Sequence, residues 1–255
     1  MLNIFLLETI HGSKRQSKDN NRLDKDYVES MDTPANCLVV GVSGGIDSSV
    51  VSTLCARTGI KTLVASMPIS QRPEHHDLSI KHKDWLTSKY QNAYGVEIDL
   101  TGTYLSFENS MTDKKFTESL GFANSKARLR MMTLYQISAS TSGIVVGTGN
   151  KIEDFGVGFY TKYGDGGVDV APIADLYKTE VWELGKFLGV DDLIVQAPPT
   201  DGLWDDKRTD EDQLGATYEQ LEEAMENGTG PGVEVLERFN TMNQHKMQPI
   251  PTFVL

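Results

Sequence analysis

The sequence predicts an α/β fold in which an open, mostly parallel, doubly wound sheet forms a single domain. Two observations predict it: four short apolar runs have the length of buried strands, and a helix-length stretch separates each run from the next. Strands that alternate with helices pair in parallel through right-handed crossovers, so that helices cover both faces of the sheet. The expected strands are 38–42, 62–67, 94–100 and 143–147, and the expected helices are 46–57, 76–90 and 123–140.

Beyond residue 150 the sequence becomes richer in glycine and polar residues. Glycine-rich polar stretches predict loops, and apolar residues at helical spacing predict helices. We expect loops over 158–173 and 197–213, a helix over 176–190 and an acidic helix over 216–226. At the other end, residues 1–20 are expected to form a docking or linker segment, residues 22–31 a short amphipathic helix, and residues 21–255 the single domain.

The composition is that of an ordinary globular protein of 255 residues with a net charge of −12. Most of the negative charge lies in 191–226, and a field of this sign argues against nucleic acid as the main partner. The apolar run at the N-terminus is too short to span a membrane. Cys37 and Cys55 lie in apolar, helix- or strand-like surroundings, which predicts buried thiols in a reducing compartment rather than a disulfide or a metal site. The cytoplasm is the expected location.

The stretch "LVVGVSGGIDSSV" (38–50) predicts a strand, a phosphate-binding turn and the start of a helix. Its glycines allow a tight turn, its serines add hydroxyl donors, and the amides at the helix N-terminus attract an anion. Asp47 cannot donate to a phosphate, so its natural partner is a divalent cation that bridges phosphates. A strand-to-helix turn with serine caps is the structural alternative, but the complete "SGGIDSS" motif favours phosphate binding.

This motif resembles the signature of the PP-loop ATP pyrophosphatases, which cleave ATP between the α- and β-phosphates and use the AMP to activate an oxygen. The region 125–178 is similar to the core of NAD synthetases, and its "TKYGDGGVD" (161–169) is specific to them. A later "APPT" and a near-terminal "QHK" fall where that family has ligand-binding residues. From about residue 20 onward, the chain is therefore identified as a member of the NAD synthetase family, which implies the adenine-nucleotide α-hydrolase-like (PP-loop) type of the fold.

The resemblance implies ATP-dependent amidation of deamido-NAD with ammonia, giving NAD, AMP and pyrophosphate through an acyl-adenylate. This reaction is the final step of NAD biosynthesis, and its implied cofactor is Mg²⁺. Relatives that use glutamine carry an extra glutaminase domain, for which a chain of 255 residues has no room. We therefore expect direct use of ammonia by a homodimer.

The resemblance also assigns site residues. ATP would be bound by Gly41, Val42, Ser43, Gly44, Gly45, Ile46, Asp47, Ser48, Thr148, Lys178 and Thr200. Deamido-NAD would be bound by Arg128, Lys162, Asp169, His245 and Lys246. The metal would be held by Asp47 and Glu153. The expected catalytic residues are Asp47 and Lys178, to which we add Asp165 because a carboxylate in "KYGDGG" could bind ammonium.

Several alternatives stay open. Glu153 could be a solvated carboxylate at a helix start, and Asp165 could either bind ammonium and accept its proton or only cap a glycine turn. Lys126 and Arg130 share one helix face, which we expect to be solvated. At the level of function, the alternatives are another PP-loop amidotransferase or thiolase, and a nucleotide-binding protein of the same fold without catalysis.

The sequence departs from the family pattern in two places within the site. Ile46 stands where a glutamine is often found, and the segment from Glu153 to Lys162 is one residue longer than in many bacterial relatives. Two polar segments, 69–84 and 201–214, follow elements that end at the expected ligand-binding edge. We expect both to act as lids that become ordered over the ligand.

Overall fold

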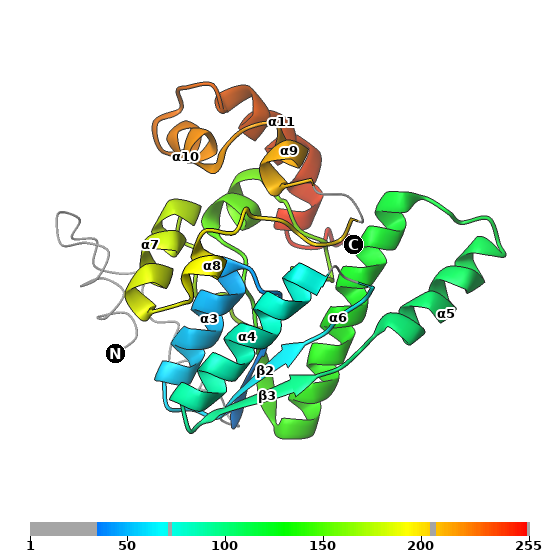
Figure 1. The fold of residues 1–255 in the computed structure, drawn as a ribbon. Helices are drawn as coiled ribbons and strands as arrows, with labels where there is room; N and C mark the ends of the chain where they lie inside the picture. The colour runs from blue at the N-terminus through cyan, green and yellow to red at the C-terminus, as the bar shows by residue number, and fades with distance from the viewer. Residues whose placement is uncertain (1–34, 71–72, 205–207, 254–255) are drawn as a thin grey trace.

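The computed structural model describes residues 35–70, 73–204 and 208–253, and the predicted parallel sheet is confirmed (Figure 1). Its four strands lie in the order β3-β2-β1-β4, and every pairing is parallel. The sheet consists of β1 (Cys37–Gly41), β2 (Thr62–Ser66), β3 (Ala93–Glu97) and β4 (Gly143–Val146). The strand predicted over 94–100 ends at Glu97, because the chain turns there toward a helix that the sequence did not predict.

Three helices connect the strands where they were predicted: α3 (Ile46–Arg57), α4 (Pro73–Lys89) and α6 (Ser119–Thr141). The unpredicted helix is α5 (Thr101–Thr112), which buries only Tyr104 and so shows no apolar period. Figure 1 shows that α5 and the start of α6 form an arm that projects from the body of the protein. The predicted lid over 69–84 is wrong for its larger part, since residues 73–84 belong to α4, where Ser79 and His82 are buried.

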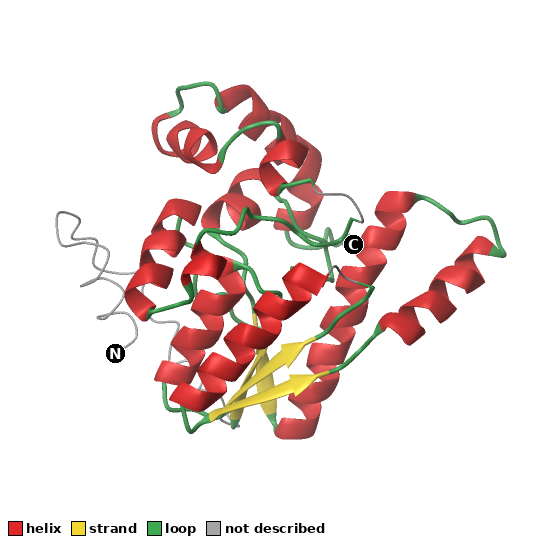
Figure 2. Ribbon diagram, viewed as in Figure 1, coloured by secondary structure: helices red, strands yellow, loops and turns green. Residues whose placement is uncertain are grey.

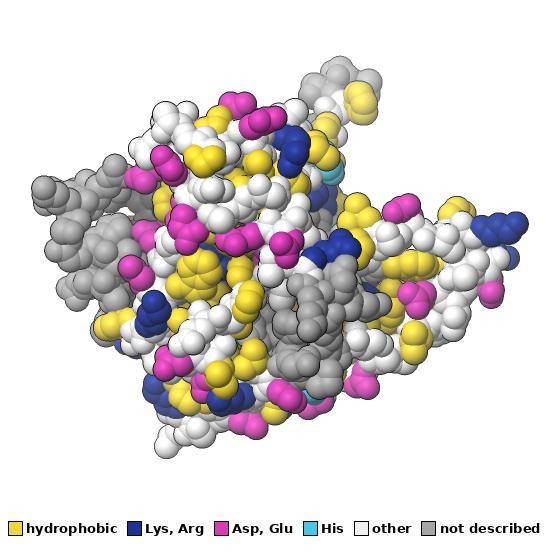
Figure 3. Space-filling view, turned by 45° about the horizontal axis from the view of Figure 1, so that its top comes forward, with side chains coloured by type: hydrophobic (Ala, Val, Ile, Leu, Met, Phe, Trp, Pro, Cys, Tyr) yellow, Lys and Arg dark blue, Asp and Glu magenta, His cyan; other side chains and the backbone are white. Residues whose placement is uncertain are grey.

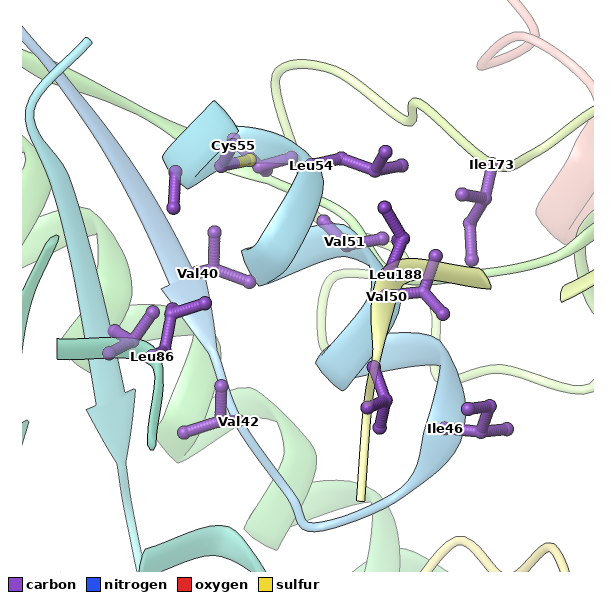
Figure 4. Packing of buried hydrophobic residues seen from close by; sticks show 14 of the residues in the cluster. Val40, Val42, Ile46, Val50, Val51, Leu54, Cys55, Leu86, Ile173 and Leu188 are labelled. Atoms are coloured by element: carbon purple, nitrogen blue, oxygen red, sulfur yellow. The ribbon is translucent and has the colours of Figure 1, made fainter. Parts of the chain in front are cut away.

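Alternate residues of the strands point to opposite faces of the sheet, and each face has its own cover (Figure 2). Val40 and Val64 pack against α3 and α4 in the main core, whereas Leu63 and Ala65 pack in a second cluster with Leu134 of α6. Helix α7 (Lys178–Leu188) packs on the outer side of α3 and completes the main core around Val50, Val51 and Leu188 (Figure 4). The sheet is therefore doubly wound, as predicted.

The C-terminal part forms a helical layer on the side toward which the strands point (Figure 1). It contains η1 (Ile152–Val157), α9 (Asp210–Leu214), α10 (Tyr218–Asn227) and α11 (Val233–Met247). The short helix α8 (Asp192–Val195) follows α7 and buries Ile194 and Val195 in the main core. The helices predicted over 176–190 and 216–226 are confirmed as α7 and α10, and the loop predicted over 197–213 is interrupted by α9. A separate apolar cluster around Ile152, Tyr218 and Leu221 holds η1 and α10 together.

The element η1 is a π-helix, and it overlaps the segment from Glu153 to Lys162 that the family resemblance implies to be one residue longer. An inserted residue would widen a helical turn into a π-turn of this kind. The carbonyl groups at its end accept hydrogen bonds from one face of α11: Asn240 donates to Gly156 at 2.9 Å and Asn243 donates to Val157 at 2.8 Å. The end of η1 is therefore stabilised by side chains of α11.

The glycine-rich loop after η1 is fixed to the outer edge of the sheet. Val170 forms a parallel bridge with Val146 of β4, and the Gly147 amide donates to the Val170 carbonyl at 2.7 Å. Asp169 accepts from the Val145 amide at 2.7 Å and from the Tyr135 hydroxyl at 3.0 Å. The edge of β4 is thereby covered, and the loop is held beside the end of the strand.

No described helix is long and apolar enough to cross a membrane. The predictions for residues 1–20 and 22–31 lie outside the described residues.

We predict that Gly185→Ala destabilises the protein by about 1–2 kcal/mol, although alanine favours a helix more than glycine does. A Cβ at Gly185 would lie 2.5 Å from Cδ1 of Ile46, a buried residue of α3. Ile46→Val removes that methyl group and should restore most of the loss in the double variant. Gly102 of α5 has nothing within 4 Å of its added Cβ, so Gly102→Ala is the matched control. Equal melting temperatures for Gly185→Ala and Gly102→Ala would contradict the prediction.

Candidate active site

The turn between β1 and α3 presents backbone amides at the carboxyl end of the sheet. Gly44 has a φ of 90°, and Gly45 forms the N-cap of α3 without a capping side chain. Ser48 accepts from the Ser43 amide at 3.2 Å and lies 3.2 Å from the Ser43 hydroxyl, so side chains within the turn fix its shape. An uncapped helix N-terminus of this kind attracts an anion.

The side chains of Val42 and Ile46 point away from this turn into the core (Figure 4). Both are buried, with 4% of each residue exposed, and Ile46 packs against α7 at Gly185. Of the predicted ATP-binding residues, these two can therefore offer a ligand only backbone atoms. This also explains why isoleucine is accommodated in place of glutamine at position 46.

The ammonium group of Lys178 joins the two carboxylates that were predicted to hold a metal. Its Nζ lies 2.5 Å from Oδ2 of Asp47 and 3.2 Å from Oε1 of Glu153. Only 2% of Lys178 is exposed, and burial alone would lower its pKa. Asp47 and Glu153 outweigh this effect, so the pKa of Lys178 is raised above its ordinary value and the ammonium group stays charged.

Asn150 orients this cluster from the segment that follows β4. Its side-chain amide donates to Oδ1 of Asp47 at 3.2 Å, while its side-chain oxygen accepts from the Ile152 and Glu153 amides at 3.1 Å each. One buried side chain thus ties Asp47 to the backbone that carries Glu153. The reading of Glu153 as a merely solvated carboxylate is wrong, because its Oε1 is within hydrogen-bond distance of both Lys178 and Tyr218.

Tyr218 and Asp210 approach the cluster from the C-terminal helices. The Tyr218 hydroxyl is 2.7 Å from Oε1 of Glu153 and 3.3 Å from Oδ2 of Asp210. Burial, together with the nearby carboxylates, raises the pKa of Tyr218, so the phenol stays protonated and can donate. Burial and the charge of Glu153 raise the pKa of Asp210 to about 7, and no described residue donates to its buried Oδ1.

Asp165 lies in the glycine-rich loop, where its Oδ1 accepts from the Thr161 amide at 3.0 Å. This contact is the turn cap expected if Asp165 has only a structural role. Part of the residue is exposed, yet the surrounding protein reduces its hydration enough to raise the pKa of Asp165 to about 6. Its charge interacts with Glu153 and Lys246, so the loop carboxylate lies close to the metal-binding candidates and to α11.

Four of the five residues predicted to bind deamido-NAD lie in one connected group. Arg128 donates through Nε to the Lys162 carbonyl at 3.3 Å, and Lys162 donates to the His245 carbonyl at 2.5 Å. Lys246 donates to the carbonyls of Gly158 and Tyr160, at 2.8 Å each. The exposed side chains of Arg128 and His245 are the parts of this group that face solvent.

The remaining predicted residues occupy separate positions. Asp169, the fifth deamido-NAD candidate, accepts hydrogen bonds from the Val145 amide of β4 and from the Tyr135 hydroxyl. Thr148 follows β4 at the ligand-binding edge, and the Thr200 hydroxyl donates to the Arg208 carbonyl at 3.3 Å.

The expectation that Lys126 and Arg130 form a solvated face is wrong. Lys126 donates to the Leu203 carbonyl at 3.1 Å, and Arg130 donates through Nε to the Met67 carbonyl at 3.1 Å. Their face of α6 is turned toward the sheet edge, because Leu134 on the same face packs against Gly41. Of the three basic residues at positions 126, 128 and 130 of α6, Arg128 is the one whose side chain is exposed.

Comparison with known proteins agrees with this geometry. A family model described as NAD synthase matches residues 19–253. The chain belongs to the NAD synthase family. Two relatives of this family are the NH(3)-dependent NAD(+) synthetases of Carboxydothermus hydrogenoformans and Alkaliphilus metalliredigens. The first is 38% identical over 83% of this chain and 86% of its own length, and the second is 37% identical over 89% and 94%.

Solved structures support the same assignment. The NMN synthetase of Francisella tularensis superposes with a TM-score of 0.78 and 33% identity, covering 87% of this chain and 91% of that chain. The NAD+ synthetase of Burkholderia pseudomallei superposes with a TM-score of 0.68 and 26% identity, covering 87% and 84%. The predicted NAD synthase family and its PP-loop fold are thus confirmed, while the roles of individual residues stay predictions.

Sequence reasoning missed Asn150, Tyr218 and Asp210. Asn150 carried a usable signal, since it follows β4 at the same sheet edge as the phosphate turn of this NAD synthase family member. Tyr218 and Asp210 carried none, because they lie on helices whose packing onto the site depends on tertiary structure.

We predict that Asp210→Asn flattens the pH dependence of stability. The pKa of Asp210 is about 7 in the folded protein and 3.8 ordinarily, so between these values the folded state holds a proton that the unfolded state has lost. The free energy of unfolding should therefore fall as the pH rises from about 4 to about 7, and asparagine removes this contribution. Urea unfolding at several pH values measures the slope. Asp175→Asn, at a largely exposed carboxylate, is the control and should leave the slope unchanged.

Proposed function

We propose that this chain makes NAD by ATP-dependent amidation of deamido-NAD, using ammonia directly and releasing AMP and pyrophosphate. The observation that carries the proposal is the bridge from Lys178 to Asp47 and Glu153, placed beside an uncapped helix N-terminus. It combines an anion-binding turn with a lysine ammonium group and two carboxylates that could bind a metal. Its relatives named NH(3)-dependent NAD(+) synthetases support ammonia as the nitrogen source.

The donor set of the site fits Mg²⁺ as the cofactor. Asp47 and Glu153 supply carboxylate oxygens, the ligands that Mg²⁺ prefers. Among the described residues no group of three or more His, Cys, Asp or Glu side chains could hold a metal by itself. This agrees with Mg²⁺ chemistry, in which one or two carboxylates share the ion with substrate phosphates. When bound, the metal would neutralise charge on the ATP phosphates.

Lys178 has two roles in the proposed reaction. Before ATP binds, its ammonium group balances Asp47 and Glu153, which would otherwise repel each other in a partly buried site. Asp47 and Glu153 would hold the metal, and the ammonium group of Lys178 would then be available to bind phosphate oxygens. As a compact charge on a flexible stem, it can follow pyrophosphate as it departs. The carboxylate of the nicotinate ring then carries AMP as an acyl-adenylate.

Asp165 acts in the second step, in which ammonia attacks the acyl carbon and AMP leaves. With a pKa of about 6, its carboxylate is charged at neutral pH and can hold an ammonium ion or accept a proton. One of its oxygens is used by the Thr161 amide, so the turn cap and the proposed role are compatible. The first step does not require this group.

A second candidate function is the synthesis of NMN from the corresponding acid mononucleotide. The observation that favours it is the superposition on the Francisella tularensis NMN synthetase, with a TM-score of 0.78. The chemistry at the carboxylate would be the same, and only the length of the pyridine nucleotide would differ.

One assay separates these functions. The purified chain is incubated with ATP, Mg²⁺ and ammonium, and with either deamido-NAD or nicotinate mononucleotide, and the amide product is measured by mass spectrometry. We expect a higher kcat/KM with deamido-NAD, and no product when glutamine replaces ammonium. Preference for the mononucleotide would establish the second function, and absence of both products would refute the proposed chemistry.

We predict that Asp47→Asn and Asp165→Asn fail at different steps. Asp47→Asn should lower ATP–pyrophosphate exchange in the presence of deamido-NAD by about a hundredfold or more. Asp165→Asn should keep this exchange but lose NAD formation by about a hundredfold, most severely at low ammonium. In the wild type, NAD formation should decline below about pH 6 while exchange persists, since Asp165 becomes protonated there. Loss of exchange in Asp165→Asn would end its assignment to the ammonia step.

We also propose that the protein is a cytoplasmic homodimer. Cys37 and Cys55 are both buried, and buried thiols agree with a reducing compartment. Large apolar side chains are exposed along the arm of α5 and α6, as Figure 3 shows on its projecting part. They are Leu105, Phe107, Phe116, Leu120 and Met132. A second copy of the chain is the proposed cover for this surface.

We predict that Leu120→Glu shifts the protein from dimer to monomer in light scattering, because it places a charge in the proposed apolar interface. Leu120 is 55% exposed in the isolated chain. Leu193 of α8 is 60% exposed and lies outside the arm, so Leu193→Glu is the control and should stay dimeric. A dimer for both variants would place the interface elsewhere.

A further inference from the structure

Arg130 is a half-buried residue whose guanidinium makes only part of the hydrogen bonds it could make. Its Nε donates to the Met67 carbonyl at 3.1 Å, just beyond the end of β2. Its Nη2 is shielded from solvent, and no described residue accepts a hydrogen bond from it. Since buried polar groups are nearly always hydrogen-bonded, an orphan guanidinium nitrogen in a folded protein calls for a partner.

The position of Arg130 on α6 places it level with the phosphate turn. Helix α6 leads into β4, so it runs against the strand direction and its N-terminal half lies at the carboxyl edge of the sheet. Leu134 packs at 3.4 Å from the Cβ position of Gly41, the last residue of β1. Arg130 lies one helical turn, about 5.4 Å, closer to the edge on the same face. It is therefore beside the turn that begins at Val42.

Met67 supports the same placement. Its side chain lies 3.3 Å from the Cβ position of Gly41, so the carbonyl that anchors Arg130 belongs to the residue next to the start of the turn. The Val42 amide donates to the Ala65 carbonyl at 2.9 Å, which fixes the turn against the end of β2. Arg130 is thus anchored beside the end of β2, the strand whose end also supports the turn.

The charges around Arg130 leave it free for an anion. Burial lowers its pKa to about 10, and the more distant carboxylates of Asp165 and Asp201 oppose this effect. The guanidinium therefore stays charged at neutral pH. Asp165 belongs to the proposed ammonia site, and Asp201 follows Thr200, a predicted ATP-binding residue.

We propose that Arg130 is a phosphate-binding residue of the ATP site, with Nη2 donating to a phosphate oxygen of ATP. The planar guanidinium suits phosphate geometry, and anchoring through Nε fixes its direction before the ligand arrives. The assignment rests on the proposed ATP-dependent function. A phosphate of deamido-NAD offers the same chemistry, but the phosphate turn beside Arg130 favours ATP.

Calorimetric titration of the full chain tests this assignment. Arg130→Gln should weaken binding of ATP with Mg²⁺ by about tenfold or more, the effect expected for a lost charged hydrogen bond, and leave deamido-NAD binding within about twofold. Arg130→Lys, which keeps the charge, should lose less. Arg128→Gln is the matched control on the opposite face of α6: it should weaken deamido-NAD binding and spare ATP binding.

Binding of adenosine, which lacks phosphates, tests whether Arg130 has only a structural role. Adenosine binding, followed by ligand-observed NMR, should be the same for the wild type and Arg130→Gln. Equal losses for adenosine and ATP would mean that Arg130 only anchors the end of β2, and would overturn the proposal. A loss confined to deamido-NAD would also overturn it. If the wild type itself bound no ATP, the proposed function would fall first and the Arg130 assignment with it.

Discussion

The site depends on one buried lysine. Lys178 is 2% exposed and within 3.2 Å of two carboxylates that come from different elements, Asp47 at the start of α3 and Glu153 in η1. Removing a charge from water is costly unless it is paired, so the fold must deliver both carboxylates to the same place. Three features bring both carboxylates to the lysine: the packing of α7 on α3, the side chain of Asn150 and the π-turn of η1.

The start of α7, which carries Lys178, is itself fixed by the C-terminal helices. Glu222 of α10 accepts from the Thr179 amide at 3.1 Å and from the Thr179 hydroxyl at 2.7 Å. From the same helix, Tyr218 reaches Glu153, and its ring lies 4.9 Å from the Lys178 ammonium group. The helical layer beyond the sheet is therefore part of the active site, and movement of this layer would change the position of the lysine.

The sequence predicted the sheet well because buried parallel strands are apolar throughout and their helices are long. It failed for α5, which buries a single residue, and for α9, whose capping box at Thr209 lies within a polar stretch. The site was predictable where it lies on a motif next to a strand end, as for Asp47, whereas Lys178 was indicated only by the family resemblance. It was not predictable for Tyr218 and Asp210, because nothing local indicates that a residue of an acidic helix will pack with its ring buried against a lysine.

For Arg130, the residue spacing predicted the correct helix face but the wrong surroundings for it. The spacing of Lys126 and Arg130 placed them on one face of α6, and the structure agrees, but that face is the one turned toward the sheet edge. The long side chains run along the helix so that their charged ends reach the carbonyls at 203 and 67, beyond the apolar contact of Leu134 with Gly41. A basic helix face beside the carboxyl ends of parallel strands should therefore be assigned to the ligand-binding edge before it is assigned to solvent, since ligands bind at that edge.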